Sequence, residues 1–137
     1  MNYWLVKSEP DVYSYDTLLK DGKGTWDGVR NYQARNNLKE MKTGDLMLFY
    51  HSNIGKEVVG IARIIKEHYQ DPTTDDTRWV VVDVAPFKKL DKPVSLIDIK
   101  ANENLQQIHL VRQGRLSVMG LKKEEFDLIV LLGSNVV

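Results

Sequence analysis

Runs of apolar residues, some continuous and some alternating with polar residues, predict that much of the chain forms short β-strands. The first run begins at Tyr3 and ends before Pro10, which has no backbone N–H to donate to a neighbouring strand. Two later runs are separated by the turn-like residues 53–56, so we expect them to form a hairpin. The expected strands are residues 3–7, 46–50, 58–65 and 78–84, with a short extended piece at 116–118.

Polar segments between these runs carry the signals that begin and end helices. Ser14 can cap a helix through its hydroxyl, and Gly22 follows the expected end of that helix. Glu124 and Glu125 lie in the first turn of a final helix, where the helix dipole favours acidic side chains. The expected helices are residues 14–20, 31–41 and 122–132, with a short one opened by Pro93 and Ser95; residues 105–111 fit a helix or a strand, and residues 68–77 are expected to be a loop.

About five short strands with helices at irregular intervals do not suit a parallel βαβ sheet, which needs strict alternation. We expect instead one α+β domain over residues 1–137, built as a small closed or nearly closed β-barrel with helices over its ends. Loops rich in unusual residues would then gather at the barrel mouths, where binding sites are commonly built. These loops are residues 8–10, 26–35, 51–55 and 112–117.

The charges cancel over the whole chain but not along it. There are 19 basic and 19 acidic residues, yet residues 20–42 carry a net charge of +3, residues 100–123 a net +4 and residues 67–83 a net −4. If the two basic segments meet in space, they form a patch that attracts anions. The first residues lack a basic leader and no apolar stretch reaches the length of a membrane span, so we expect a cytoplasmic protein that does not enter a membrane.

Motifs for metal, cofactor and nucleophile chemistry are missing. The absence of cysteine excludes disulfides, iron–sulfur clusters and thiol catalysis, and no phosphate-binding glycine loop is present, so no cofactor is expected. The adjacent residues His51 and Ser52 would point to opposite faces of a strand, which opposes a direct base–nucleophile pair. The three histidines, His51, His68 and His109, are too far apart along the chain to predict a metal site.

Aromatic, amide and basic side chains are instead concentrated in two segments. Residues 26–35 place an indole, a phenol, amides and two guanidiniums close together, and residues 49–52 add two rings, an imidazole and a hydroxyl. Planar bases stack on such rings, polar groups read their edges, and Arg or Lys takes the phosphates. Trp4 and Trp79 are expected in the core, whereas Trp26, set between turn residues, fits the core and a site equally well.

Five ordered segments closely resemble the motifs of the EVE domain family, and the resemblance extends from about residue 2 to residue 132. One departure is Gly120, where the family usually has proline; glycine makes the chain after the last motif more flexible. The matching segments are Trp4–Pro10, Trp26–Arg35, Phe49–Ser52, Gly60–Arg63 and Arg115–Met119.

This resemblance implies an α+β, PUA-like fold, a small β-barrel of about five to six strands with short flanking helices. It also implies a binding module more than an enzyme, because EVE domains are thought to recognise modified bases such as 5-methylcytosine in DNA. The related YTH domains read N6-methyladenine in RNA. The expected partner is therefore DNA or RNA carrying a modified base, bound by a monomer or weak homodimer.

Carried onto this sequence, the resemblance implies a base pocket between the end of the first strand and the loop that holds Trp26. Trp26 would form the stacking wall, while Ser8 and Glu9 would face the Watson–Crick edge of the base. Asn31 would satisfy another edge group or fix the loop. The remaining expected positions are Tyr50 or Tyr32 opposing Trp26, His51 and Ser52 on the floor, Arg115 and Ser117 on the opposite rim, and Lys7, Arg30 and Arg35 on phosphates.

Two other functions remain open at the level of the sequence. One is a small hydrolase acting on a nucleoside-like or amide substrate, with Lys7, Glu9 or His51 as the acid–base groups. The other is a sensor that binds a free metabolite. Salt separates these from a nucleic-acid binder, because binding to a polynucleotide weakens steeply with salt and binding to a neutral metabolite does not.

Overall fold

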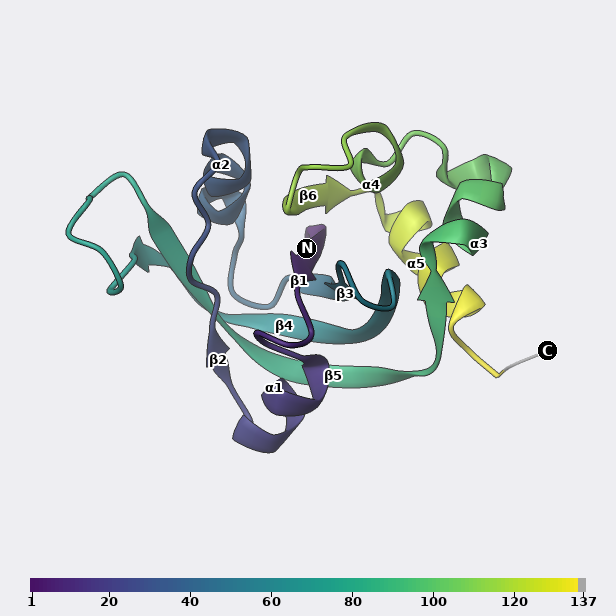
Figure 1. Cartoon of the computed structure of the whole chain (residues 1–137), viewed down its shortest axis with the longest axis horizontal. Helices are drawn as coiled ribbons and strands as arrows, with labels where there is room; N and C mark the ends of the chain where they lie inside the picture. The colour runs from purple at the N-terminus through teal and green to yellow at the C-terminus, as the bar shows by residue number, and fades with distance from the viewer. Residues whose placement is uncertain (136–137) are drawn as a thin grey trace.

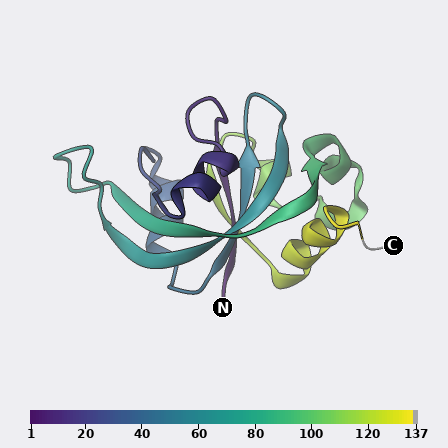
Figure 2. The ribbon, with the colours of Figure 1, turned by 90° about the horizontal axis from the view of Figure 1, so that it is seen from below.

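A six-stranded sheet organises residues 1–135, the part of the chain that the computed structural model describes (Figure 1). Two of its strands are much longer than the others and sweep across the molecule as a curved ribbon (Figure 2). The strands are β1 (Tyr3–Ser8), β2 (Gly24–Thr25), β3 (Leu46–His51), β4 (Glu57–Gln70), β5 (Val80–Ser95) and β6 (Val118–Leu121).

The helices lie in the connections around this sheet, and their caps follow from the sequence. The Ser14 hydroxyl accepts a hydrogen bond from the Thr17 amide at the start of the first helix, and Gly22 ends it with a positive φ of 78°. No helix within residues 1–135 has the length and apolar character needed to cross a membrane. The helices are α1 (Tyr15–Asp21), α2 (Tyr32–Glu40), α3 (Leu96–Ala101), α4 (His109–Arg112) and α5 (Lys123–Leu132), with a single 3₁₀ turn at Glu103–Leu105.

The strands are hydrogen-bonded in the order β2-β5-β4-β3-β1-β6, so the expected α+β fold is confirmed, but the sheet is open and a barrel is not shown. Strand β1 lies parallel to β3 and antiparallel to β6, while β3, β4 and β5 form an antiparallel meander. The edge strand β2 has only two residues, which leaves little backbone to close a ring. On the other edge, the Asn37 side chain of α2 donates to the Val118 carbonyl at 2.7 Å, which gives that edge carbonyl a partner from a helix.

The expected elements are present, but the two long strands extend further than the sequence pattern indicates. Strand β4 continues into the expected loop, and β5 passes through both of its prolines. Pro86 stands opposite Ala62 next to a register shift, and bulges of this kind are among the places where a sheet tolerates a residue without an N–H. The short helix expected to be opened by Pro93 and Ser95 is α3, which begins at Leu96 with Ser95 as its N-cap, while Pro93 still belongs to β5. The ambiguous segment 105–111 contains the end of the 3₁₀ turn and most of α4.

The Tyr15 side chain fixes α1 against the sheet. Its ring stacks on Phe49 with centroids 5.3 Å apart, and its hydroxyl donates to the Ile61 carbonyl at 2.6 Å. A Cβ on Gly60 would collide with this ring, so only glycine allows so close an approach of helix and strand. The motif glycine at position 60 is therefore explained by packing.

Candidate functional site

A cavity of about 580 Å³ lies beside the end of β1, next to β2 and the loop that follows it. This volume falls in the range of pockets that hold small organic ligands. Its walls come from three parts of the chain that are distant in sequence, and the side chains that matter below are Lys7, Ser8, Tyr13, Trp26, Arg30 and Ser117.

Trp26 forms a fixed wall of this cavity. Its backbone N–H donates to the Val82 carbonyl at 2.8 Å, which extends the pairing of β2 by one residue. Its indole lies edge-on to Phe49, with ring centroids 5.2 Å apart at 88°, and to Tyr13 at 6.4 Å and 84°. With only 7% of its surface exposed, Trp26 belongs to the core and to the cavity wall at once.

Lys7 and Ser8 connect the end of β1 to two loops that border the cavity. The Lys7 amide donates to the Ser117 carbonyl at 2.9 Å, and its Nζ donates to the Gly114 carbonyl at 2.5 Å. The Ser8 hydroxyl donates to the Tyr13 carbonyl at 2.6 Å. Burial lowers the pKa of Lys7, because desolvation disfavours its ammonium form.

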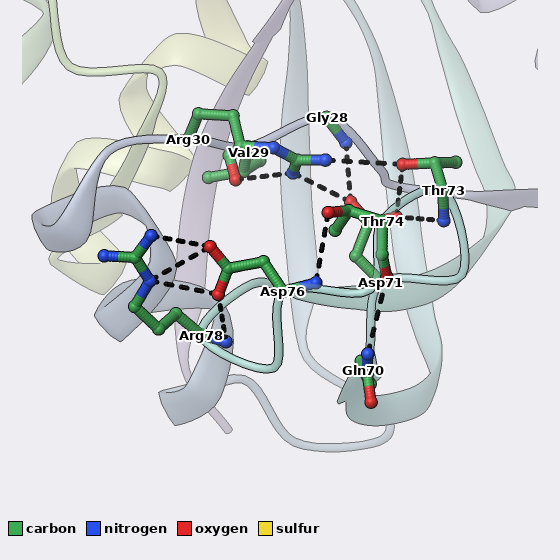
Figure 3. Close-up of polar contacts among 9 residues, drawn as sticks. All are labelled: Gly28, Val29, Arg30, Gln70, Asp71, Thr73, Thr74, Asp76 and Arg78. Atoms are coloured by element: carbon green, nitrogen blue, oxygen red, sulfur yellow. Dashed lines mark hydrogen bonds and ion pairs between the residues drawn. The ribbon is translucent and has the colours of Figure 1, made fainter.

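The loop that carries Trp26 is anchored by the buried carboxylate of Asp71 (Figure 3). Its Oδ2 accepts from the Gly28 amide at 3.1 Å and from Arg30 at 2.9 Å, and its Oδ1 accepts from the amide and hydroxyl of Thr73 at 2.7 and 2.5 Å. Burial alone would raise the pKa of Asp71, but the hydrogen bonds from Thr73, Arg30 and Gly28 outweigh it and lower the pKa to about 2. Asp71 is therefore ionised at neutral pH, and each of its carboxylate oxygens accepts two hydrogen bonds.

Arginine and aromatic side chains form a continuous row that leads away from the rim of the cavity. Tyr32 stacks on the buried Trp79 with centroids 5.3 Å apart, and the Arg35 guanidinium lies 5.0 Å from the Tyr32 ring. Arg30 and Arg78 each lie 5.7 Å from the Trp79 ring, and Arg78 also donates to the Tyr32 hydroxyl at 2.8 Å. Cation–π contacts of this kind hold the guanidiniums in place while leaving N–H groups for other partners.

Of the residues expected at the site, the structure brings five together around the cavity: Lys7, Ser8, Trp26, Arg30 and Ser117. The two basic segments of the sequence also meet next to it, since the side-chain amides of Gln33 and Gln113 lie within hydrogen-bond distance at 3.3 Å. A smaller cavity of about 320 Å³ at this junction is lined by Asn31 and Arg115.

The other expected residues are not among those that line the cavity of about 580 Å³. Glu9 accepts from the Asn53 side chain at 2.8 Å, and Asn31 accepts from the Ala34 amide at 2.9 Å as the N-cap of α2, in keeping with the loop-fixing role expected for it. His51 Nε2 accepts from the Tyr15 amide at 3.1 Å, and burial lowers the pKa of His51. Four further residues also lie outside this lining: Tyr32 and Arg35 in the arginine–aromatic row, the buried Tyr50, and Ser52.

Three residues that sequence reasoning did not single out shape the site, namely Tyr13, Asp71 and Arg78. The hydroxyl of Tyr13 is buried without a hydrogen-bond partner among residues 1–135, and a Cβ on Gly24 would collide with it. The glycine at position 24 was therefore a signal in the sequence that another part of the chain, here the Tyr13 side chain, packs closely against β2. Asp71 left no such sign, because an aspartate in a loop with proline and threonine is typical of solvent exposure. Within the same described residues, no group of three or more His, Cys, Asp or Glu side chains is placed to hold a metal ion.

Comparison with known proteins gives consistent matches over nearly the whole chain. The family model of the EVE domain matches residues 2–132. Thymocyte nuclear protein 1 of Mus musculus is 37% identical, over 96% of this chain and 73% of its own length. The crystal structure of a protein from Agrobacterium tumefaciens has a TM-score of 0.95 and 43% identity, covering 97% of this chain and 93% of its own. The human THYN1 protein in complex with DNA containing 5-methylcytosine has a TM-score of 0.91 and 31% identity, covering 100% of both chains.

These relatives also correct the expected location of the protein. A cytoplasmic protein was expected from the sequence, but the relatives from mouse, rat and human are all named thymocyte nuclear protein 1. Their names point to the nucleus, so the cytoplasmic expectation is wrong. Its basis was only the lack of an export signal and of a membrane span, and neither feature separates a nuclear protein from a cytoplasmic one.

Proposed function

Because this chain belongs to the EVE domain family, we propose that it is a non-catalytic module that binds a modified base in DNA, with 5-methylcytosine as the first ligand to test. The observation that carries the proposal is the cavity of about 580 Å³ beside Trp26. It lies in a chain that superposes with a TM-score of 0.91 on a human protein whose structure holds 5-methylcytosine DNA. A base would enter this cavity after leaving its stack, which costs a few kcal/mol in a duplex and less in a single strand.

In this proposal the base packs on Trp26 and its edge is read at the end of β1. The rigid contacts of Trp26 with Phe49 and Tyr13 keep the wall in place before the ligand arrives, so little conformational entropy is lost on binding. Lys7 and Ser8 line the cavity from β1, and Ser117 lines it from the loop that pairs with Lys7. Stacking on such a ring contributes roughly 1–3 kcal/mol per base.

The arginine–aromatic row then binds the phosphates on either side of the base. Arg30 belongs to both features, because it lines the cavity and lies over Trp79. Its side chain is 39% exposed and that of Arg78 is 58% exposed, although each also pairs with an aspartate. Among the three arginines of the row, Arg35 alone forms no ion pair with a carboxylate in the described part of the chain. Its guanidinium donates to the neutral Asn36 side chain at 2.8 and 3.1 Å, so its charge is not neutralised. We propose Arg35 as the main backbone contact and Arg30 as the contact nearest the base.

The proposal also covers RNA as a carrier of the base and a chain that acts as a monomer or weak homodimer. Binding to RNA would use the same cavity, since a stacked base presents the same face in either polymer. A hydrolase is not proposed. Of its three expected acid–base groups only Lys7 lines the cavity, whereas Glu9 and His51 do not line it and both accept hydrogen bonds from other parts of the fold, so no acid–base pair is assembled there.

A titration that follows tryptophan fluorescence tests this function. Short single-stranded and duplex oligonucleotides, in DNA and RNA form, carry cytosine, 5-methylcytosine, 5-hydroxymethylcytosine, adenine or N6-methyladenine at one position, each at two salt concentrations. We expect quenching that prefers one modified base and weakens with salt. A response only to free nucleosides, or the same affinity for modified and unmodified strands, would contradict the proposal. Sedimentation of the free and bound protein gives the oligomeric state.

A further inference from the structure

The hydrogen-bonding polarity of the cavity wall is fixed at Ser8. Its hydroxyl has one proton, and the Tyr13 carbonyl, which can only accept, takes that proton at 2.6 Å. Toward the cavity, the Ser8 oxygen therefore offers only lone pairs. A hydroxyl normally adapts to either kind of partner, but this one acts as an acceptor.

Lys7 offers the opposite polarity next to it. An ammonium group has three N–H donors and no acceptor, and the Gly114 carbonyl takes one of these donors at 2.5 Å. The other two remain for a ligand. Lys7 and Ser8 both line the cavity, so an acceptor from Ser8 and a donor from Lys7 border the same space.

We propose that this pair makes the cavity selective for a base whose edge carries an exocyclic amine beside a ring acceptor, and that it rejects thymine. This inference rests on the proposed function and adds to it a rule for which methylated base is bound. The amine at N4 of 5-methylcytosine donates a hydrogen bond to the Ser8 oxygen, and an acceptor on the ring accepts a hydrogen bond from the Lys7 ammonium. Ser8 is the specificity-determining residue of the pair.

Thymine is the strictest comparison because it has the same ring size and the same 5-methyl group. It differs from 5-methylcytosine at position 4, where a carbonyl replaces the amine, and at N3, which gains a proton. In the same pose its O4 would face the Ser8 lone pairs and leave both oxygens without a donor. It can offer its N3–H to Ser8 only by sliding along the wall, which displaces its ring and methyl group from Trp26. A buried polar group without a partner lowers affinity by about tenfold to a hundredfold.

Four oligonucleotides that differ only at one base test this rule. Cytosine, 5-methylcytosine, uracil and thymine separate the contribution of the amine from that of the methyl group. We expect both amine bases to bind at least about tenfold more tightly than their keto counterparts. Ser8→Ala removes the acceptor and should bring the ratio of 5-methylcytosine to thymine close to one. Ser8→Thr keeps the hydroxyl and should keep the ratio, and thermal unfolding shows that both variants are folded.

The outcomes separate this inference from the proposed function. If the wild-type protein binds 5-methylcytosine and thymine equally well, the polarity rule is overturned and base binding stands. If Ser8→Ala keeps the full preference while folded, the assignment to Ser8 is overturned. If no oligonucleotide binds, whatever its base, the proposed function itself is overturned.

Discussion

Asp71 and Arg30 form an ion pair at 2.9 Å between the end of β4 and the loop after β2, with the carboxylate fully buried. The same carboxylate oxygen accepts from the Gly28 amide, whose residue has the positive φ of 78° that glycine adopts without strain. The turn that follows Trp26 is thus held by a residue of the acidic segment. Two segments that look like separate charged surfaces in the sequence are thus joined by this ion pair beside the cavity.

Replacing Asp71 by asparagine should loosen this loop. The amide keeps the shape but loses the charge that Arg30 and Gly28 bind, so the free energy of unfolding should fall by about 2–3 kcal/mol. Affinity for the modified base should fall as well, because Trp26 and Arg30 are no longer held. Urea unfolding and the fluorescence titration measure the two effects.

The matched control for this prediction is Asp75→Asn. Asp75 lies in the same loop and is exposed, so removing its charge should leave both stability and affinity close to wild type. Equal losses in the two variants would show that the charge of the loop matters and that the contacts of Asp71 do not.

Trp26 needs two substitutions, because it serves the core and the cavity. Trp26→Ala should destabilise the fold by about 3–5 kcal/mol, since the indole is buried against Phe49 and Tyr13. Loss of binding in that variant would then be ambiguous. Trp26→Phe keeps a ring in the core and should remain folded while binding the base several-fold more weakly, as a smaller ring offers less stacking surface. Unchanged affinity in a folded Trp26→Phe variant would show that the base does not stack on Trp26.

The sequence was informative about the strands and uninformative about how the sheet ends. Continuous apolar runs such as residues 46–50 and 78–84 predict strands because burial selects those residues. Whether the sheet closes depends on β2, and two residues, Gly24 and Thr25, carry no periodic signal. The sequence therefore could not indicate that the sheet stays open, and the structure does not show the expected barrel.

The same contrast holds at the candidate site. The sequence allowed Trp26 in the core and in a site equally, and in the structure it belongs to both. Lys7 and Ser8 were expected at the site only from the resemblance to the EVE domain family, because a polar pair at a strand end is otherwise typical of a solvated edge. Asp71 was not predictable, since its role depends on a contact with Arg30 across 41 positions of sequence. Glu9 was expected at the cavity from the family resemblance, but its carboxylate instead accepts from Asn53.

Gly60 should not tolerate even one added methyl group. In Gly60→Ala the new Cβ would fall inside the Tyr15 ring, which cannot retreat because it stacks on Phe49 and bonds Ile61. We expect a loss of at least about 3 kcal/mol in the free energy of unfolding. Gly114→Ala is the control, since a Cβ there meets open space, and its thermal midpoint should match that of wild type. A Gly60→Ala protein as stable as wild type would mean that α1 does not pack against β4 in this way.

Stability should fall as the pH drops below about 6.5 because of His51. Burial is the main cause that lowers its pKa, with Glu57 and Asp16 acting against it, and the neutral ring accepts a hydrogen bond from Tyr15. In the unfolded chain this histidine is protonated near its ordinary pKa of about 6.5. The stability that comes from the neutral ring is therefore complete above that pH, and it is lost as the pH falls toward the lower pKa of His51 in the folded protein. Urea midpoints at pH 7.5 and 5.5 should differ less in His51→Gln than in wild type. An identical pH dependence in the two proteins would assign the effect to other groups.

Arg35 should contribute to affinity by binding a phosphate, and its contribution should therefore depend on the salt concentration. The logarithm of the binding constant falls linearly with the logarithm of salt concentration, with a slope of about 0.7 to 0.9 per phosphate contact. Arg35→Gln should lower the magnitude of that slope by about one contact while leaving the preference for the modified base unchanged, because the arginine lies on α2 outside the cavity. Lys100→Gln removes an equal charge from α3, on the opposite side of the molecule from α2 (Figure 1), and should leave the slope as it is. Equal changes in the two variants would mean that DNA responds to the total charge of the protein, and a loss of base preference in Arg35→Gln would place this guanidinium at the base itself.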